Sequence, residues 1–320
     1  MKYKILFFML LLFFNFNSNT FAIFAPEGKI TFRIVDEQGK SIEGVNASAG
    51  FRFPDIQQGG ITGTRSETLT SSDGLLVASG RTMDQVGYSA KKSGYYISKG
   101  IYRFNDNKSD RWLPWNPTVE ILLRKIENPV PMYARNTRYT NLKIPGTGKE
   151  VGFDLIEHDW TPPYGKGKIT DFIFKFDNRY TKSNDFNSTL TIKFINKYDG
   201  IQYYAEDRKG GSLFKLPRFA PLSGYQKEWS KSIKGVPGKP WALGLKDDNN
   251  YFFRVRSEVE DGKLKRAMYG KIQGNIRIMP DGLLMFVYYL NPDYTRNMEY
   301  GKNLFKIERR VEKVFIDTAN

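Results

Sequence analysis

Several side chains capable of acid–base chemistry gather between residues 154 and 171. Four carboxylates surround His158, the only histidine of the chain, and they belong to Asp154, Glu157, Asp159 and Asp171. Hydrolysis of a glycosidic bond needs two carboxyl groups roughly 5–9.5 Å apart. These residues are therefore the candidates for an extracellular polysaccharide hydrolase with dispersed carboxylates, which is one of two functional interpretations of this chain.

The spacing of these groups limits what the segment can do alone. Apolar residues alternate from 151 to 155, which predicts a strand that leads into the loop 162–167. On one strand Asp154 and His158 share a face but lie about 13 Å apart, at roughly 3.3 Å per residue. Asp154 and Asp159 would point to opposite faces. A catalytic pair would need a second group from elsewhere, and the alternative is a strand end capped by hydrogen bonds.

Aromatic residues beside prolines offer a different kind of site. The segment Trp112-Leu113-Pro114-Trp115 places two indoles three residues apart, and Trp160 and Tyr164 flank the prolines at 162 and 163. Exposed rings of this kind can stack on sugar rings, whereas buried ones fill the end of a core. Trp112, Trp115, Trp160 and Tyr164 are the candidates for glycan contact, with burial as the alternative for the first two.

Composition excludes several kinds of cofactor chemistry. The chain has no cysteine and a single histidine, so disulfides, thiolate zinc sites and sites with two imidazoles are excluded. Neither 145–149 nor 165–168 has the glycine spacing and the Ser or Thr of a phosphate-binding loop. We therefore expect no cofactor and no metal site.

The net charge of +15 indicates possible partners. Such an excess attracts an anionic surface polymer or an acidic glycan, but the charge is also explained by a lysine-rich solvated surface without such a partner. No run of five consecutive basic residues and no nucleic-acid motif accompanies the charge, so we expect no nucleic acid. The sequence does not indicate an oligomeric state.

Residues 1–22 have the pattern of a secretory signal peptide. Lys2 and Lys4 precede the apolar run Ile5–Phe14, and Thr20-Phe21-Ala22 offers small residues at the positions that a signal peptidase reads. This run is about half the roughly 20 residues that cross a bilayer, and no later segment is longer. We expect a secreted, periplasmic or cell-envelope protein that starts at Ile23 and has no transmembrane segment after cleavage.

Short strands and turn residues alternate in the first third of the chain. Residues 29–35 alternate as a strand, and Asp36–Lys40 supplies a turn. The segment 70–77 repeats this logic around Asp73-Gly74, and Val119–Leu123 closes the set.

This order resembles the carboxypeptidase regulatory-like domain, a prealbumin-like (transthyretin-like) β-sandwich. The matching segments are the opening strand, 36–39, 42–44, 70–74 and Gly94-Tyr95, within about residues 28–126. The resemblance implies a β-sandwich in an accessory, non-catalytic role, in a fold grouped with carbohydrate-binding-like sandwiches. The chain departs from the pattern at Val45, where alanine is usual, and in a Gly-rich insertion from Phe51 to Ser66.

A stiff segment, Asn128-Pro129-Val130-Pro131, predicts the boundary between domains 23–127 and 128–320. Strand signals dominate the second domain, which predicts a mostly antiparallel β domain. It resembles exported bacterial proteins of unknown function through Tyr269–Ile272 and Tyr288–Pro292, a resemblance that implies no activity.

One hairpin of the second domain can be predicted residue by residue. A two-residue turn at Asp261-Gly262 would pair opposite charges on one face and apolar residues on the other. The predicted pairs are Glu260 with Lys263, Glu258 with Lys265, Val259 with Leu264 and Val255 with Met268.

The fold class that these patterns predict is all-β, with a prealbumin-like sandwich followed by a second β domain. The first functional interpretation is an exported non-catalytic binding or structural protein that recognises a glycan or another cell-surface polymer. The hydrolase is the alternative.

Overall fold

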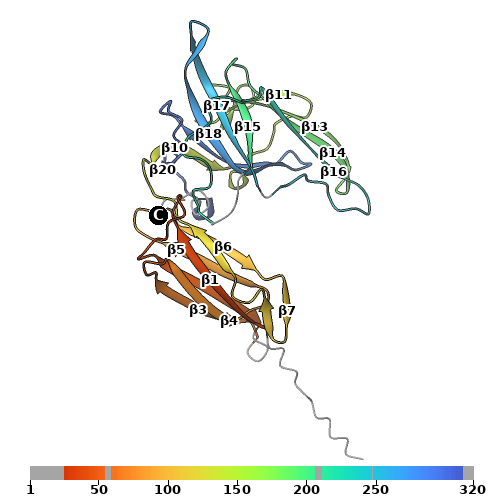
Figure 1. Ribbon diagram of the computed structural model, residues 1–320. Coiled ribbons are helices and arrows are strands. Elements are labelled where there is room, and N and C mark those ends of the chain that lie inside the picture. The colour runs from red at the N-terminus through yellow and green to blue at the C-terminus, as the bar shows by residue number, and fades with distance from the viewer. Residues whose placement is uncertain (1–24, 55–58, 206–210, 247, 313–320) are drawn as a thin grey trace, which may run out of the picture.

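The computed structural model describes residues 25–54, 59–205, 211–246 and 248–312. Nearly all of their regular structure is β-strand, which confirms the all-β prediction, and the strands form two bodies (Figure 1). The predicted signal peptide, residues 1–22, lies outside the described residues. Within them, no helix has the length and apolar character needed to cross a bilayer.

The first body, which we call the N-terminal sandwich, consists of two sheets. One has the order β4-β1-β8-β7, with β9 also paired to β1, and the other has the order β3-β2-β5-β6. The bounds are β1 (Glu27–Val35), β2 (Asn46–Pro54), β3 (Ile61–Leu69), β4 (Leu75–Arg81), β5 (Gln85–Lys91), β6 (Ser98–Arg103), β7 (Asp106–Lys108), β8 (Arg111–Leu113) and β9 (Thr118–Leu122).

Alternation of apolar and polar residues builds the core of this sandwich. Ile30, Phe32 and Ile34 of β1 are fully buried and share a core with Phe51 of β2. The turn after β1 forms where the sequence predicts it, because the Asp36 carboxylate accepts the backbone N–H groups of residues 38 and 40. Burial of each large apolar side chain contributes about 1.5–3 kcal/mol.

The Gly-rich insertion predicted from Phe51 to Ser66 is largely strand. β2 continues to Pro54, and β3 returns antiparallel from Ile61 with Phe51 opposite Thr64. Glycines weaken the strand signal in this part of the sequence, but Gly63 faces the Phe51 carbonyl so closely that a Cβ there would lie 1.9 Å from its oxygen. The insertion therefore lengthens one sheet.

The second body, the C-terminal sandwich, packs a six-stranded sheet, β15-β17-β18-β19-β10-β20, on a five-stranded sheet, β12-β11-β13-β14-β16. An aromatic-rich core fills the space between them; for example, the rings of Phe172 and Phe253 are 5.1 Å apart. The bounds are β10 (Val130–Asn136), β11 (Glu150–Asp154), β12 (Asp159–Trp160), β13 (Phe172–Lys182), β14 (Asp185–Lys193), β15 (Gly200–Ala205), β16 (Glu228–Gly235), β17 (Asn249–Glu260), β18 (Lys263–Ile278), β19 (Leu284–Asn291) and β20 (Tyr300–Asn303), with a 3-10 turn at Thr137–Tyr139.

The predicted hairpin forms with its turn at Asp261-Gly262. Three of the predicted pairs are present, Glu260 with Lys263, Val259 with Leu264 and Val255 with Met268. The fourth is wrong, because irregular register between Val255 and Val259 places Glu258 opposite Arg266. Asp199 accepts the N–H groups of Arg256 and Ser257 at this bulge, a partner that the local pattern cannot indicate.

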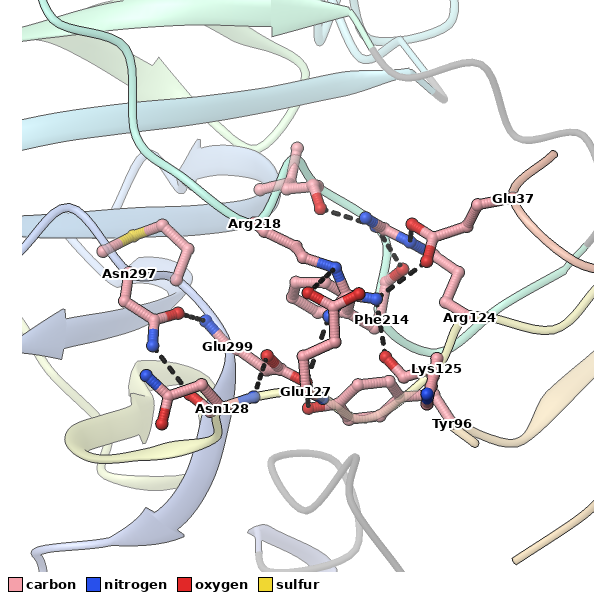
Figure 2. A network of polar contacts seen from close by, with 12 residues as sticks. Glu37, Tyr96, Arg124, Lys125, Glu127, Asn128, Phe214, Arg218, Asn297 and Glu299 are labelled. Atoms are coloured by element: carbon pink, nitrogen blue, oxygen red, sulfur yellow. Dashed lines mark hydrogen bonds and ion pairs between the residues drawn. The ribbon is translucent and has the colours of Figure 1, made fainter. Parts of the chain in front are cut away.

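A buried polar network joins the two sandwiches (Figure 2). Glu299 is almost fully buried, and its carboxylate accepts the Tyr96 hydroxyl at 3.0 Å and the backbone N–H groups of Glu127 and Asn128. Arg218 Nη1 lies 3.1 Å from the same carboxylate. The segment that connects the two sandwiches is therefore held by side chains from both of them.

A second part of this network surrounds Glu37 and Phe214. Both Arg124 and Arg218 bind the Glu37 carboxylate at 2.8 Å. Burial opposes ionisation of Glu37, but these two guanidinium groups hold its pKa below the ordinary value. The Phe214 ring stacks on Tyr96 at 4.9 Å, and Arg124 lies over its face. Charged and aromatic contacts thus fix one sandwich on the other.

Candidate functional site

The predicted acidic segment lies at the end of β11, where the chain reverses. The strand ends at Asp154, residues 155–158 turn, and β12 pairs back with Asp159 opposite Asp154. His158 has φ of 54°, a left-handed conformation that the reversal requires. The prediction of one strand through His158 is therefore wrong, and the 13 Å separation derived from it does not apply.

Asp154 and Asp171 meet on one guanidinium group. Arg256 Nη2 donates to Asp154 Oδ1 at 2.8 Å and to Asp171 Oδ2 at 2.9 Å, and its Nε donates to Asp171 Oδ1 at 2.8 Å. Both carboxylates are almost completely buried. Two of the predicted carboxylates thus converge on an arginine inside the protein.

Backbone N–H groups also donate hydrogen bonds to these two carboxylates. Asp154 accepts the N–H groups of residues 156, 157, 168 and 169, and Asp171 accepts that of Leu155. Burial raises the pKa of Asp171 despite Arg256, whereas backbone hydrogen bonds outweigh burial and lower the pKa of Asp154. Neither Asp154 nor Asp171 lines either of the two hollows described below, and the oxygens of both carboxylates are already hydrogen-bonded. Their arrangement stabilises the turn and the loop around it.

The other two acids also make local contacts. Glu157 is exposed and forms an ion pair with Lys168 at 2.5 Å. Asp159 accepts the N–H groups of Trp160 and Lys166, and a Cβ on Gly165 would lie 2.5 Å from its carboxylate. Asp159 therefore closes the Pro-Gly loop, which is why a glycine is needed there.

His158 uses both ring nitrogens inside the protein. Nδ1 lies 3.0 Å from the Tyr288 hydroxyl and Nε2 lies 3.0 Å from the Thr140 hydroxyl. Burial, and then the charge of Arg135, lower the pKa of His158 to about 3, so the ring is neutral at physiological pH. A shallow hollow of about 390 Å³ lies beside it, lined by Thr140–Lys143 and His158–Trp160.

The four predicted glycan-contact residues separate into two classes. Trp112 is 9% exposed, and its indole N–H donates to the Thr82 carbonyl, while Trp160 is 7% exposed and packs on Phe153. Trp115 and Tyr164 are 37% and 38% exposed. The two indoles of the 112–115 segment do not form one exposed surface, because Trp112 is buried in the core of the sandwich.

A larger hollow lies on the N-terminal sandwich, over a sheet for which the sequence predicts no binding site. We call it the trough; it has a volume of about 740 Å³ and lies over the sheet β3-β2-β5-β6. Its floor is formed by small residues of the two central strands, with Ser48 opposite Ser89 and Gly50 opposite Gly87. Four strands about 4.8 Å apart give a face roughly 14 Å wide, enough for one extended chain.

Longer side chains of the outer strands form the walls of the trough. Arg65 of β3 stands on one side and donates to Ser48 Oγ at 3.2 Å, and Lys99 of β6 stands on the other. Arg52 lines the same hollow, and among the lining residues that the structure describes none is acidic. Gln85 contributes a buried side-chain oxygen without a hydrogen-bond partner in the described residues. The trough is therefore cationic and has polar groups with unused capacity.

A weak sequence signal for the trough exists in retrospect. Ser48 and Gly50, like Gly87 and Ser89, are small residues at alternate positions and so share one face of a strand. Which strands pair to place these faces side by side is not contained in the local pattern.

No three His, Asp or Glu side chains of the described residues are grouped so that they could hold a metal ion. The expectation of no cofactor stays a prediction.

Comparison with models of known protein families finds no match for the chain, and no curated protein matches it. The resemblance to the carboxypeptidase regulatory-like family is therefore unconfirmed, although the β-sandwich that it implies is present.

Among solved structures, the chain is similar to a candidate carbohydrate-binding protein from Bacteroides uniformis, with 13% identity, coverage of 82% of this chain and 96% of that one, and a TM-score of 0.18. It is also similar to BcpA, the major pilin subunit of Bacillus cereus, with 11% identity, coverage of 82% and 67%, and a TM-score of 0.21. TM-scores this low do not establish a shared fold.

Proposed function

We propose that the protein is an exported, non-catalytic binding protein that holds an extended anionic polymer, of the acidic glycan class, in the trough. The observation that supports this proposal is the lining of the trough, whose described residues include the cations Arg52, Arg65 and Lys99 and no carboxylate. Cationic walls over a floor of small side chains suit a chain that lies flat and carries negative groups. Export rests on the pattern of residues 1–22.

The hydrolase has less support. It needs two carboxyl groups on either side of a substrate, and Asp154 and Asp171 instead share Arg256 with their oxygens already hydrogen-bonded. The pure stacking platform also has less support, because Trp112 and Trp160 are buried.

Binding to polygalacturonate and to a neutral β-glucan, each at low and high salt, tests the proposal. We expect polygalacturonate to bind and the neutral polymer to bind less, with affinity falling between about 50 and 200 mM salt. Arg52→Gln/Arg65→Gln should remove binding. Gly87→Trp should block it by placing an indole over the floor of the trough, since a Cβ at Gly87 meets no atom within 4 Å.

A matched control separates the trough from general charge. Lys175→Gln/Arg179→Gln removes two cations from β13, on the C-terminal sandwich, and should leave binding unchanged. Equal loss in the control would show that net charge alone attracts the polymer. Loss in Trp115→Ala, with the trough variants unaffected, would move the site to the exposed indole.

A further inference from the structure

The strand β3 is an open sheet edge, unlike its counterpart across the same sheet. At the other edge, β6 is covered by the segment 211–213, where Lys99 N–H donates to the Gly211 carbonyl and Leu213 N–H donates to the Ile97 carbonyl. Among the described residues, β3 pairs with β2 alone. Eight of its nine residues are exposed, including Ile61 and Leu69 at its two ends.

Nothing in β3 itself prevents the addition of another strand. Exposed edges are usually shortened, bulged, interrupted by proline or protected by charged side chains, because a free row of N–H and C=O groups can pair with another chain. β3 is nine residues long, keeps regular register with β2 from Ile61 to Leu69, contains no proline, and carries two charges of opposite sign, Arg65 and Glu67. This edge is therefore competent for strand pairing.

The side chains of β3 are complementary to a second copy of the same strand. A two-fold axis perpendicular to the sheet makes the two strands antiparallel and keeps equivalent faces on one side. With the axis at Ser66, Arg65 of each copy lies opposite Glu67 of the other, and Leu69 lies over Gly63. On the reverse face Thr64 meets Thr68, a favourable cross-strand pair.

Neighbouring registers lack this complementarity. An axis at Arg65 places the two arginines opposite each other, and an axis at Glu67 does the same with the two glutamates. Like charges directly opposite each other destabilise a strand pair. In the single chain Arg65 and Glu67 form an ion pair at 3.3 Å along their own strand, and Arg65 also donates to Ser48, but both side chains remain exposed.

We propose that two copies of this protein associate through β3, antiparallel about Ser66, so that two four-stranded sheets become one sheet of eight strands. The same two-fold axis places both troughs on one face of the joined sheet. The association needs no bound polymer, although it shares Arg65 with the wall of the trough.

Sedimentation velocity of the purified protein over a range of concentrations tests this proposal. The wild-type protein should shift from monomer to dimer as its concentration rises. Glu67→Arg makes the edge entirely basic and Arg65→Glu makes it entirely acidic, so each variant alone should stay monomeric. An equimolar mixture of these two variants should form a heterodimer, and Arg65→Glu/Glu67→Arg should dimerise as the wild type does.

Both positions are exposed, so the melting temperature of each variant should match that of the wild type at concentrations where the wild type is monomeric. A wild-type protein that is monomeric at every concentration would overturn the proposal. So would a Glu67→Arg variant that dimerises as well as the wild type, or a mixture of the two variants that stays monomeric.

Discussion

The turn after β11 and the trough both concentrate polar side chains, but they use them differently. Around the turn, Asp154 and Asp171 bind Arg256 and backbone N–H groups, and His158 binds two hydroxyls. Over the trough, Arg52 and Lys99 face a hollow of about 740 Å³. The sequence predicts candidate catalytic residues at the turn, because acidic residues and the histidine are close together there. The open polar surface, however, lies on the N-terminal sandwich.

The difference shows what distinguishes a structural polar cluster from a binding surface. Buried charges are retained when every oxygen and nitrogen has a partner, and such a cluster has nothing left to offer a ligand. A binding surface needs polar groups whose hydrogen-bonding capacity is not already used within the protein. The comparison therefore predicts large losses of stability from changes at the turn and small ones from changes in the trough.

The largest effect is expected for Asp171→Ala. This substitution leaves Arg256, whose side chain is 15% exposed, with the buried Asp154 and one carboxylate missing, and loss of one partner of a buried ion pair costs about 3–5 kcal/mol. Urea denaturation at pH 7 should show a free energy of unfolding reduced by that amount. A reduction below about 1 kcal/mol would mean that the pair is solvated and that the turn does not depend on it.

Asp177→Ala is the matched control on the neighbouring strand. Asp177 forms an ion pair with Lys175 at 3.2 Å on the exposed face of β13. Exposed pairs of this kind contribute about 0–1 kcal/mol, so the two aspartates should differ severalfold in their effects.

A smaller effect, visible in pH dependence, is expected for His158→Asn. The pKa of His158 is about 3 in the folded protein against 6.5 for an unperturbed histidine, so protonation favours unfolding. Its contribution to stability is complete above pH 6.5 and is lost as the pH falls toward 3, by up to about 1.4 kcal/mol per unit. Asparagine tolerates the left-handed conformation at this position and does not titrate.

Urea denaturation of both proteins at several pH values between 7 and 4 measures this difference. The free energy of unfolding of the wild type should approach that of His158→Asn, or fall below it, as the pH decreases. Parallel curves over the whole range would show that His158 is no less basic in the folded protein than in the unfolded chain.

Features that depend on neighbouring residues can be predicted from the sequence, whereas contacts between residues that are far apart in it cannot. The turns at Asp36 and at Asp261-Gly262 depend on residues a few positions apart, so the local sequence predicts them. Arg256 reaches Asp154 across 102 positions, and no local pattern indicates that contact. β3 is hard to predict for another reason, because its two apolar residues, Ile61 and Leu69, lie at its ends and no apolar alternation between them indicates a strand.

The smallest effect on stability is expected in the trough, for Gly87→Ala. Glycine in a strand interior is less favourable than alanine by about 0.5–1 kcal/mol, and a Cβ at Gly87 meets nothing within 4 Å, so this substitution should stabilise the protein slightly. Gly270 of β18 is the matched control in the C-terminal sandwich, where a Cβ would lie 2.0 Å from the Phe253 ring. Gly270→Ala should destabilise the protein by about 1–3 kcal/mol, because the core must move. Thermal denaturation of both variants measures the contrast, and equal losses would mean that the face over Gly87 is filled and that no open trough exists.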